Sequence, residues 1–346
     1  MNIYEQDIYT QPNDIREALQ FYVDNQYAEK IQALSEKKFS KIILTGMGSS
    51  YSACMNANTM LRNHGLPCTV ETTSQLLHYE MPSIDRDTLL VMVSQSGRSG
   101  EIVELIEKLA VPCTVVGLTN NDDSPLGKRA DLLLNLHVKA ERAVSTRTYL
   151  APVVLMHLFA VAYIGGNTEG AIAQLRDSLQ NLEDSIKDFE TMGEQIKAFA
   201  GLPPYVALIG RGCNLCTVDA GALFFKEVAK YPSIPFDAGQ FRHGPFEMIG
   251  PDFTAIVFAP GGVGCDKQLR LADDIAEKGS KVVVLTDRDS LKSSENILVI
   301  HQKYVSEELA PVVNILPVQC FANHIAKAKG LNVGEFLYSN KVTTVQ

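Results

Sequence analysis

The stretch Leu89-Leu90-Val91-Met92-Val93-Ser94-Gln95-Ser96-Gly97-Arg98-Ser99-Gly100-Glu101 decides the fold class of this chain. Its apolar first part is typical of a buried strand. The polar part predicts a loop that leads into a helix, where free backbone N–H groups and the helix dipole suit an anion. The hydroxyls of Ser94, Ser96 and Ser99 add hydrogen-bond donors. The run therefore predicts a site for a terminal phosphate group.

A second serine loop follows another strand-like run. Gly46-Met47-Gly48-Ser49-Ser50 comes directly after Lys41–Thr45, and two such loops in one sheet indicate a small phosphorylated ligand. The residues expected to bind its phosphate are Gly48, Ser49, Ser50, Ser94, Gln95, Ser96 and Ser99. The alternative is that both loops are ordinary turns rich in small residues.

Length and composition are those of a globular enzyme. The 346 residues, 46% of them hydrophobic, suffice for about two domains. A net charge of −9 argues against non-specific binding to nucleic acid, which needs a basic surface. No apolar run approaches the length of a membrane span, and the polar start Met1–Asp7 shows no secretory signal. We therefore expect a cytoplasmic protein whose anion site is built locally by loops.

Seven cysteines, an odd number scattered along the chain, predict reduced thiols. Cys213 and Cys216 form a Cys-x-x-Cys pair, but the chain has no second such pair and no close pair of histidines to complete a zinc site. We expect structural cysteines and no bound metal.

Short β-branched runs alternate with stretches of helical period, which is typical of parallel α/β sheets. The runs expected to be strands are Lys41–Met47, Pro67–Thr72, Thr88–Gln95, Cys113–Thr119 and Leu132–His137 in the first half, and Tyr205–Arg211, Phe253–Ala259, Lys281–Asp287 and Glu295–His301 in the second. The pattern predicts the fold class α/β, with a parallel sheet in each half. The segment Tyr231–Asp237 is assigned to no element.

A long apolar stripe separates the two groups of strands. Its members recur at steps of three and four residues, as on one face of a single long helix; they are Ile172, Leu175, Leu179, Leu182, Ile186, Phe189, Met192 and Ile196. The predicted division is an N-terminal domain over 1–166, a packed connecting helix over 167–201 and a C-terminal domain over 202–346.

The two halves resemble each other, which indicates an internal duplication. Ile43–Ser49 matches Ala207–Cys213, and Val115–Asn120 matches Val282–Asp287. The match fails where the first half has its serine loop, because the second half carries Ala259–Gly264 there, without a hydroxyl. One copy is therefore expected to keep the phosphate loop, and the other to serve different chemistry.

Gly46-x-Gly48 after a strand, with Glu71 near the end of the next strand, imitates part of a dinucleotide-binding fingerprint. The third glycine is missing, because Tyr51 stands in its place. A dehydrogenase would also have no use for a second phosphate loop. The pattern therefore favours a phosphorylated small molecule over a nicotinamide cofactor.

These motifs and several others occur in an order that resembles the sugar isomerase (SIS) domain family in its tandem form. The others are Asp7–Pro12, Val144–Arg147, Gly210–Gly212 and Phe241–Pro245, and together the motifs span nearly the whole chain. The family includes the isomerase half of glucosamine-6-phosphate synthase, amino-sugar deaminases and fructosamine-6-phosphate deglycases. The resemblance implies two doubly wound, flavodoxin-like α/β domains with parallel sheets, a homodimer with shared active sites, and no cofactor or metal.

Glu227 and His243 are the candidate catalytic residues. Glu227 follows two phenylalanines on a core-facing helix, where desolvation favours a carboxyl group that acts as a base near neutral pH. The imidazole of His243 suits proton transfer to the ring oxygen of a cyclic sugar. Taken singly, each has an ordinary alternative, a solvated glutamate and a helix-capping histidine. The resemblance implies proton transfer between C1 and C2 by Glu227, ring opening by His243, and a His243 that reaches the neighbouring subunit's site.

Three further residues enter the predicted site through the resemblance. Lys341 matches a lysine in a family tail that enters the active site, where it would neutralise an oxyanion or bind the open-chain carbonyl. The alternative for this polar tail is disorder. Glu141 and Ser145 lie in a loop that the family uses to frame the sugar.

Two departures from the family pattern favour a deglycase. Ala220 and Phe224 stand where synthases and deaminases of the family carry glutamate and lysine. The first strand begins near Lys41, so we also expect no N-terminal glutaminase domain. We therefore predict a phosphosugar enzyme that acts on the C–N bond of a 6-phosphorylated fructosamine or amino sugar. The alternatives left open are a glucosamine-6-phosphate deaminase, an aldose–ketose phosphosugar isomerase and a non-catalytic phosphosugar sensor.

Overall fold

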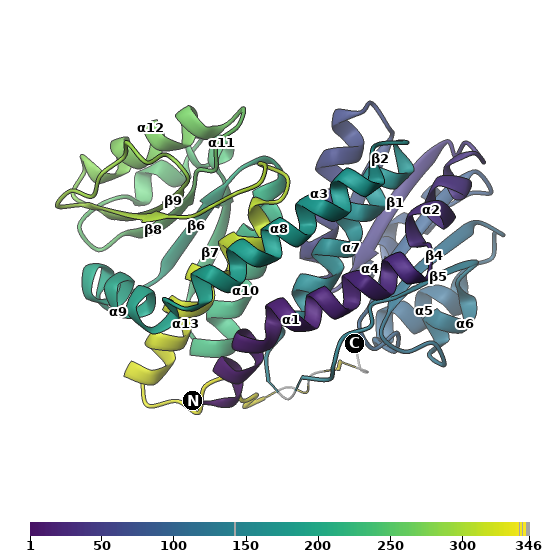
Figure 1. Ribbon diagram of the computed structural model, residues 1–346, viewed down its shortest axis with the longest axis horizontal. Coiled ribbons are helices and arrows are strands. Elements are labelled where there is room, and N and C mark those ends of the chain that lie inside the picture. The colour runs from purple at the N-terminus through teal and green to yellow at the C-terminus, as the bar shows by residue number, and fades with distance from the viewer. Residues whose placement is uncertain (142, 339, 341, 344–346) are drawn as a thin grey trace. The chain divides into compact units, whose positions relative to one another are not determined.

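The structure is a computed structural model that describes residues 1–141, 143–338, 340, 342 and 343 (Figure 1). Its strands form two five-stranded sheets, with the orders β2-β1-β3-β4-β5 and β10-β9-β8-β6-β7. All the strand pairs are parallel. Counted from its own first strand, each sheet has the order 2-1-3-4-5, which is the flavodoxin-like order. The prediction of an α/β fold with two doubly wound parallel sheets is confirmed.

The strands of the first sheet are β1 (Lys41–Gly46), β2 (Cys68–Thr72), β3 (Thr88–Val93), β4 (Thr114–Thr119) and β5 (Leu132–Asn135), and those of the second are β6 (Val206–Gly210), β7 (Ser233–Asp237), β8 (Thr254–Phe258), β9 (Lys281–Thr286) and β10 (Ile297–His301). The helices are α1 (Ile3–Asp24), α2 (Tyr27–Ser35), α3 (Ser49–Asn63), α4 (Thr73–Gln75), α5 (Gly100–Lys108), α6 (Pro125–Arg129), α7 (Arg147–Tyr163), α8 (Thr168–Ile186), α9 (Phe189–Ala200), α10 (Leu215–Ala229), α11 (Ala238–Phe241), α12 (Cys265–Ala276) and α13 (Ala310–Ala328). Short π or 3-10 turns are η1 (Leu76–Glu80), η2 (Met81–Ser83), η3 (Gly212–Asn214) and η4 (Pro245–Met248).

The chain forms two compact units, one around each sheet. The first-sheet unit comprises residues 13–141, 145–175 and the described residues after 335, and the second-sheet unit comprises 1–12, 143–144 and 176–335. The chain passes from one unit to the other within α1 and within α8, and also on either side of 143–144 and after residue 335. The predicted domain boundaries stay a prediction, whereas the assignment of five strands to each unit follows from the sheets themselves.

In the first-sheet unit, helices cover the sheet on both faces. Every residue of β3 is buried, as a strand covered on both faces requires. Leu90 and Met92 share a core cluster with Ile43 of β1 and with apolar residues of η1, α5 and α6. Helices α3 and α7, which are absent from that cluster, pack on each other, and α3 contacts β1 and β2.

The second-sheet unit repeats this layering. Ile209 and Val257 of the sheet share a core cluster with apolar residues of α11 and α12. Helix α10 contacts β6, and α13 contacts both α10 and α9. A Cβ atom added to Gly221 of α10 would lie 2.6 Å from Leu208 Cδ2, so the glycine lets this helix approach the sheet closely.

The sequence analysis missed strand β7, which lies in the unassigned segment Tyr231–Asp237. The strand contains Pro235, which pairs in register with Leu208 of β6. Proline lacks an N–H group and is therefore confined to edge strands, and β7 is the edge of its sheet. The sequence analysis missed this strand because a proline argues against a central strand, although it is compatible with an edge strand.

The prediction of one long helix over the apolar stripe is wrong. The stripe is divided between α8, which ends at Ile186, and α9, which begins at Phe189. Between them, the backbone N–H groups of Lys187 and Asp188 bond three residues back, to the carbonyls of Asp184 and Ser185, in a tightened turn. Ile186 and Phe189 are both buried, so the three-residue step of the apolar pattern continues across the break and hides it.

The seven cysteines are buried and form no disulfide, which agrees with the prediction of structural thiols. Cys216 and Cys213 form no disulfide, and the Cys216 thiol donates a hydrogen bond to the Cys213 carbonyl. Among the helices that the structure describes, none combines the length and the hydropathy needed to cross a membrane.

The close approach at the end of β1 predicts a stability effect. A Cβ atom on Gly46 would lie 2.9 Å from the Val93 carbonyl oxygen and 3.0 Å from backbone atoms of Ser50 and Tyr51. We expect Gly46→Ala to destabilise the protein by about 1–3 kcal/mol, because the backbone must shift to admit the methyl group. Thermal unfolding measures the effect. Gly250→Ala is the control, because nothing lies within 4 Å of the added atom, and equal melting temperatures for the two variants would contradict the prediction.

Candidate functional site

The two serine loops leave from neighbouring strand ends in the first-sheet unit. Gly46, the last residue of β1, is in register with Val93, the last residue of β3, and on its other side with Thr72 of β2. Because the chain continues from β1 to one neighbour and later returns to the other, this is the point at which the strand order reverses. Open α/β sheets bind ligands outside the carboxyl ends of the strands at such a point.

Backbone hydrogen bonds fix the loop Ser94–Ser99 to the end of β4. The Ser94 N–H donates to the Leu118 carbonyl over 3.0 Å, and the Asn120 N–H donates to the Gln95 carbonyl over 2.9 Å. The Thr119 hydroxyl donates to the same Gln95 carbonyl over 3.2 Å. None of these bonds to the end of β4 uses a serine hydroxyl of the loop.

The serine hydroxyls of this loop lie close together. Ser94 Oγ and Ser99 Oγ are 3.2 Å apart, and Ser96 Oγ accepts a hydrogen bond of 3.1 Å from the Arg98 N–H. Ser99 is the residue before α5, yet its side chain makes no capping bond to that helix. Ser94 is buried, Ser96 and Ser99 are half-buried, and Arg98 is exposed. The arrangement presents hydroxyl groups and a helix start that suit several oxygens of one phosphate.

Gly97 allows the loop to make its turn. Its φ of 63° lies in the left-handed region that favours glycine. An added Cβ atom would lie 2.0 Å from Ser124 Oγ, and the Gly97 carbonyl accepts a bond from the Leu126 N–H. The loop therefore packs directly on the segment that starts α6.

The loop after β1 is built in a similar way. Gly48 has a φ of 53° and is the residue before α3. Ser50 is buried and Ser49 half-buried in the first turn of that helix, and no side chain caps it. The structure thus brings the predicted phosphate-binding residues of both loops to one edge of one sheet.

The end of the chain contacts the start of α5. The Gly100 N–H, the first of the helix, donates a hydrogen bond of 3.1 Å to the Thr343 carbonyl. This contact joins residues far apart in the sequence, and no local pattern could have predicted it. Lys341, which the sequence places in the site, lies outside the described residues.

Glu227 occupies the last turns of α10 in the second-sheet unit, where it is half-buried behind the buried Phe224 and Phe225. Lys230, just after the helix, donates hydrogen bonds from Nζ to the carbonyls of Glu227 and Glu335. Burial lowers the pKa of Lys230, although the charges of Glu227 and Glu335 act in the opposite direction. The partly desolvated Lys230 therefore lies close to Glu227, the predicted base, in the chain.

His243 lies after α11 in the same unit and is exposed. The helix is capped by Asp237, whose carboxylate accepts hydrogen bonds from the N–H groups of Gly239 and Gln240 at 2.8 and 2.9 Å. The backbone N–H of His243 bonds to the Gln240 carbonyl, and Gly244 follows with a φ of 116°. The backbone of this segment is ordered by the cap, and the imidazole is left accessible.

Glu141 is buried and its carboxylate holds the start of α7. Oε1 accepts hydrogen bonds from the N–H and hydroxyl of Thr146 and from the N–H of Thr148, and Oε2 accepts one from the Thr148 hydroxyl. Arg147 Nε lies 3.8 Å from Oε1. These bonds order the start of α7, and the framing of a ligand by Glu141 and by the half-buried Ser145 stays a prediction.

The sequence analysis did not find a buried ion pair beside Glu141. Arg147 Nη1 lies 2.6 Å from Asp14 Oδ2, and both side chains are buried. Lys139 joins the same carboxylate at 2.8 Å and Glu17 at 3.2 Å. Asp14 lies over a hundred residues before Arg147, so this buried pair leaves no local signal in the sequence.

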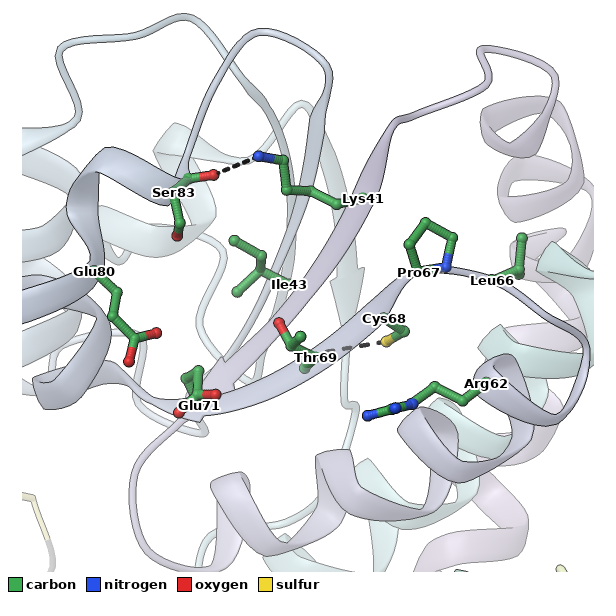
Figure 2. A pocket seen from close by; sticks show the side chains of 10 residues that line it. All are labelled: Lys41, Ile43, Arg62, Leu66, Pro67, Cys68, Thr69, Glu71, Glu80 and Ser83. Atoms are coloured by element: carbon green, nitrogen blue, oxygen red, sulfur yellow. Dashed lines mark hydrogen bonds between the residues drawn. The ribbon is translucent and has the colours of Figure 1, made fainter.

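A cavity of about 440 Å³ lies against the edge strand β2 (Figure 2). It is lined by Lys41, Ile43, Arg62, Leu66, Pro67, Cys68, Thr69, Glu71, Glu80 and Ser83. The cations Lys41 and Arg62 are offset by two acids, and burial, with a contribution from the charge of Glu80, raises the pKa of Glu71. None of the predicted site residues lines this cavity, and Lys41 is already paired with Asp85.

Within the described part of the chain, no group of three or more His, Cys, Asp or Glu side chains is placed to hold a metal ion. The donors of the serine loops are hydroxyl and N–H groups, which bind anions in preference to cations.

The chain belongs to the SIS domain family. The family model matches residues 33–162 and 205–327, which together make up well over half of the chain and contain both sheets. The family assignment made from the motifs is confirmed.

Curated relatives carry the name glutamine–fructose-6-phosphate aminotransferase (isomerizing). The protein from Pyrococcus horikoshii is 31% identical over 339 residues, which cover 94% of this chain and 55% of the relative. The protein from Escherichia coli K12 is 26% identical and covers 99% of this chain and 58% of the relative. The chain thus spans about half the length of the curated relatives that it matches.

Solved structures share the fold over nearly the whole chain. The C-terminal domain of glucosamine-fructose-6-phosphate aminotransferase from Francisella tularensis superposes with a TM-score of 0.83 at 21% identity, covering 97% of this chain and 98% of that one. A glucosamine-6-phosphate deaminase from Thermotoga maritima gives a TM-score of 0.79 at 16% identity, with 99% of both chains covered.

The hydrogen bonds of Glu141 predict that its removal destabilises the protein. We expect Glu141→Ala to lower the melting temperature, because buried donors of Thr146 and Thr148 lose their acceptor at about 1–3 kcal/mol each. Glu17→Ala, which removes an exposed acid of the same unit, is the control and should change the melting temperature little. An unchanged melting temperature for Glu141→Ala, with weaker binding of a phosphosugar, would instead indicate that Glu141 frames the ligand.

Proposed function

We propose that the protein is a phosphosugar enzyme that acts on the C–N bond of a 6-phosphorylated fructosamine or amino sugar, as a fructosamine-6-phosphate deglycase does. The observation that carries the proposal is the pair of serine loops at the switch point of the first sheet, with hydroxyls of Ser94 and Ser99 3.2 Å apart. Membership of the SIS family and the likeness to aminotransferases of fructose 6-phosphate support a phosphorylated ketose-type ligand.

In the proposed reaction, His243 opens the sugar ring by giving a proton to the ring oxygen. Glu227 then removes a proton from C1 of the ketoamine and a proton returns to C2, while O2 gains a proton and the nitrogen loses one. The C2 carbonyl thereby becomes a hydroxyl, and the C1–N single bond becomes a C1=N imine. Water adds to C1, the C–N bond breaks, and an aldose 6-phosphate and a free amine leave. The bound phosphate keeps C1 and C2 oriented throughout. Lys341 is the proposed partner of the oxyanion.

The sequence of α10 favours a deglycase within this class. Phe224 is fully buried at the position where the aminotransferase and deaminase pattern has lysine, so this helix offers one cation fewer beside Glu227. The second candidate is an aldose–ketose isomerase, because proton transfer between C1 and C2 is common to both reactions. Assays for free amine and for isomerised sugar phosphate separate the two.

The serine loop predicts the affinity for phosphate. We expect Ser94→Ala combined with Ser96→Ala to weaken binding of fructose 6-phosphate at least about tenfold, because a hydrogen bond to a charged group contributes about 1.5–3 kcal/mol. Titration calorimetry measures the dissociation constant. Ser290→Ala, an exposed serine of the other unit, is the control and should bind like the parent protein. Equal affinities in all three proteins would contradict the assignment of the serine loop as the phosphate-binding site.

The proposed base and the proposed shared site can be tested together. Glu227→Gln and His243→Ala should each lose amine release from a fructosamine 6-phosphate while still binding fructose 6-phosphate. If each site of a homodimer takes Glu227 from one chain and His243 of the partner subunit, mixed dimers regain one intact site. Equimolar mixing after unfolding and refolding should then restore about a quarter of the parent activity. No recovery, in mixtures shown to contain mixed dimers, would contradict the shared site.

A further inference from the structure

The loop after β8 occupies, in the second sheet, the place that the serine loop has in the first. Strand β6 pairs with β8 as β1 pairs with β3. The Ala259 N–H donates to the Leu285 carbonyl over 2.8 Å, as the Ser94 N–H donates to the Leu118 carbonyl over 3.0 Å. Ala259 is therefore the counterpart of Ser94, and the loop Pro260–Gly264 leads into α12 as the serine loop leads into α5.

The chain itself supplies an anion to this second loop. The Gly261 N–H donates a hydrogen bond of 2.7 Å to Asp287 Oδ1, and the Val263 N–H donates one of 3.1 Å to Glu307 Oε2. A Cβ atom on Gly262 would lie 2.0 Å from Glu307 Oε2, so that carboxylate lies directly on the loop backbone. Two carboxylates thus use N–H groups of the kind that bind phosphate.

The two carboxylates come from positions that have counterparts in the first sheet. Asp287 directly follows Thr286 of β9, as Asn120 directly follows Thr119 of β4. The Gln302 N–H bonds to the Thr286 carbonyl, as the Leu136 N–H bonds to the Thr119 carbonyl, so Gln302 and Leu136 are counterparts. Glu307 follows Gln302 by the same number of residues as Glu141 follows Leu136. In the first sheet the two counterparts leave the loop free, because Asn120 is neutral and the Glu141 carboxylate is used by α7.

Polar groups beside the second loop lack partners. Arg211 Cδ and Gln268 Nε2 lie 3.5 and 3.6 Å from the place that a Cβ atom on Gly264 would take. Gln268 is only 1% exposed. Within the described part of the chain, its Oε1 and the Nε of Arg211 are buried without a hydrogen-bond partner. The Nε of Arg211 is a guanidinium donor next to a loop that carries N–H groups. Such a donor suits an anion that is larger than a single carboxylate.

The two occupying carboxylates differ in their exposure to solvent. Burial raises the pKa of Glu307, and the charge of Glu308 acts in the same direction, while the bond from Val263 acts against both. Glu307 is half-buried and Asp287 exposed. An added phosphate would meet both negative charges at the loop, so the two kinds of anion exclude each other.

We propose that the loop after β8 is a second phosphate-binding loop that the chain keeps occupied with Asp287 and Glu307. Removal of these side chains would free the N–H groups of Gly261 and Val263, with Arg211 beside them, for a phosphate monoester or inorganic phosphate. The parent chain binds one phosphate group because Asp287 and Glu307 occupy the second loop, and in this respect the inference rests on the proposed function.

The test uses Asp287→Ala combined with Glu307→Ala in the full chain, titrated with inorganic phosphate. We expect about two phosphate groups per chain in this variant and one in the parent protein, and a crystal soaked with phosphate should show the second group at Gly261 and Val263. A folded variant that binds no more phosphate than the parent overturns the proposal, because the carboxylates would then be ordinary caps of a turn. Phosphate found at this loop in the parent protein overturns it as well.

Two further variants make the result decisive. Glu277→Ala combined with Asp289→Ala removes the same net charge from exposed positions of the same unit, and a second phosphate there would overturn the proposal in favour of a general charge effect. If the first variant does not fold, Glu307→Ala alone frees the Val263 N–H and should gain a weaker second site; no gain overturns the proposal.

The serine variants separate this proposal from the proposed function. With Ser94→Ala and Ser96→Ala added, the Asp287 and Glu307 variant should keep one phosphate, now at the second loop. Failure of the parent protein to bind phosphate would count against the proposed function alone, and a phosphate gained by the variant would still support the second loop.

Discussion

The parallel pairing of β1 with β3 is the constraint on which the first-sheet unit depends. The last residues of the two strands, Gly46 and Val93, are in register, so the loops that follow them start side by side. The close approach is possible only because Gly46 has no Cβ atom, which would lie 2.9 Å from the Val93 carbonyl oxygen. Neither loop could present its hydroxyls to the same ligand if the strands were not neighbours, and a crossover connection makes them so.

Much of the fold could be predicted because the decisive signals are local. Apolar runs bounded by serine and glycine loops located nine of the ten strands, and the tandem motifs identified the family. Strand β7 was missed because Pro235 is compatible only with an edge, and edge position is a property of the assembled sheet. The break between α8 and α9 was missed because buried Ile186 and Phe189 keep the helical step across it.

The candidate site could be predicted only in part, for the same reason. The loop Ser94–Ser99 is a continuous motif, and the structure places its hydroxyls together. The partners of Glu141 and the buried pair of Asp14 with Arg147 depend on contacts that no spacing records. Glu227 and His243 were carried over from the family, and their roles remain predictions. Two sheets of one topology carry different loops, because the loop after β8 has no hydroxyl and bonds to carboxylates instead.

The proline in β7 has a consequence for how copies of this molecule can associate. An exposed strand edge is a template for another chain, and growth from one molecule to the next along such edges leads to fibrils. Pro235 offers no N–H group at the middle of that edge, so a strand added there would lack a rung of its ladder. Open-ended polymerisation through this edge is therefore disfavoured.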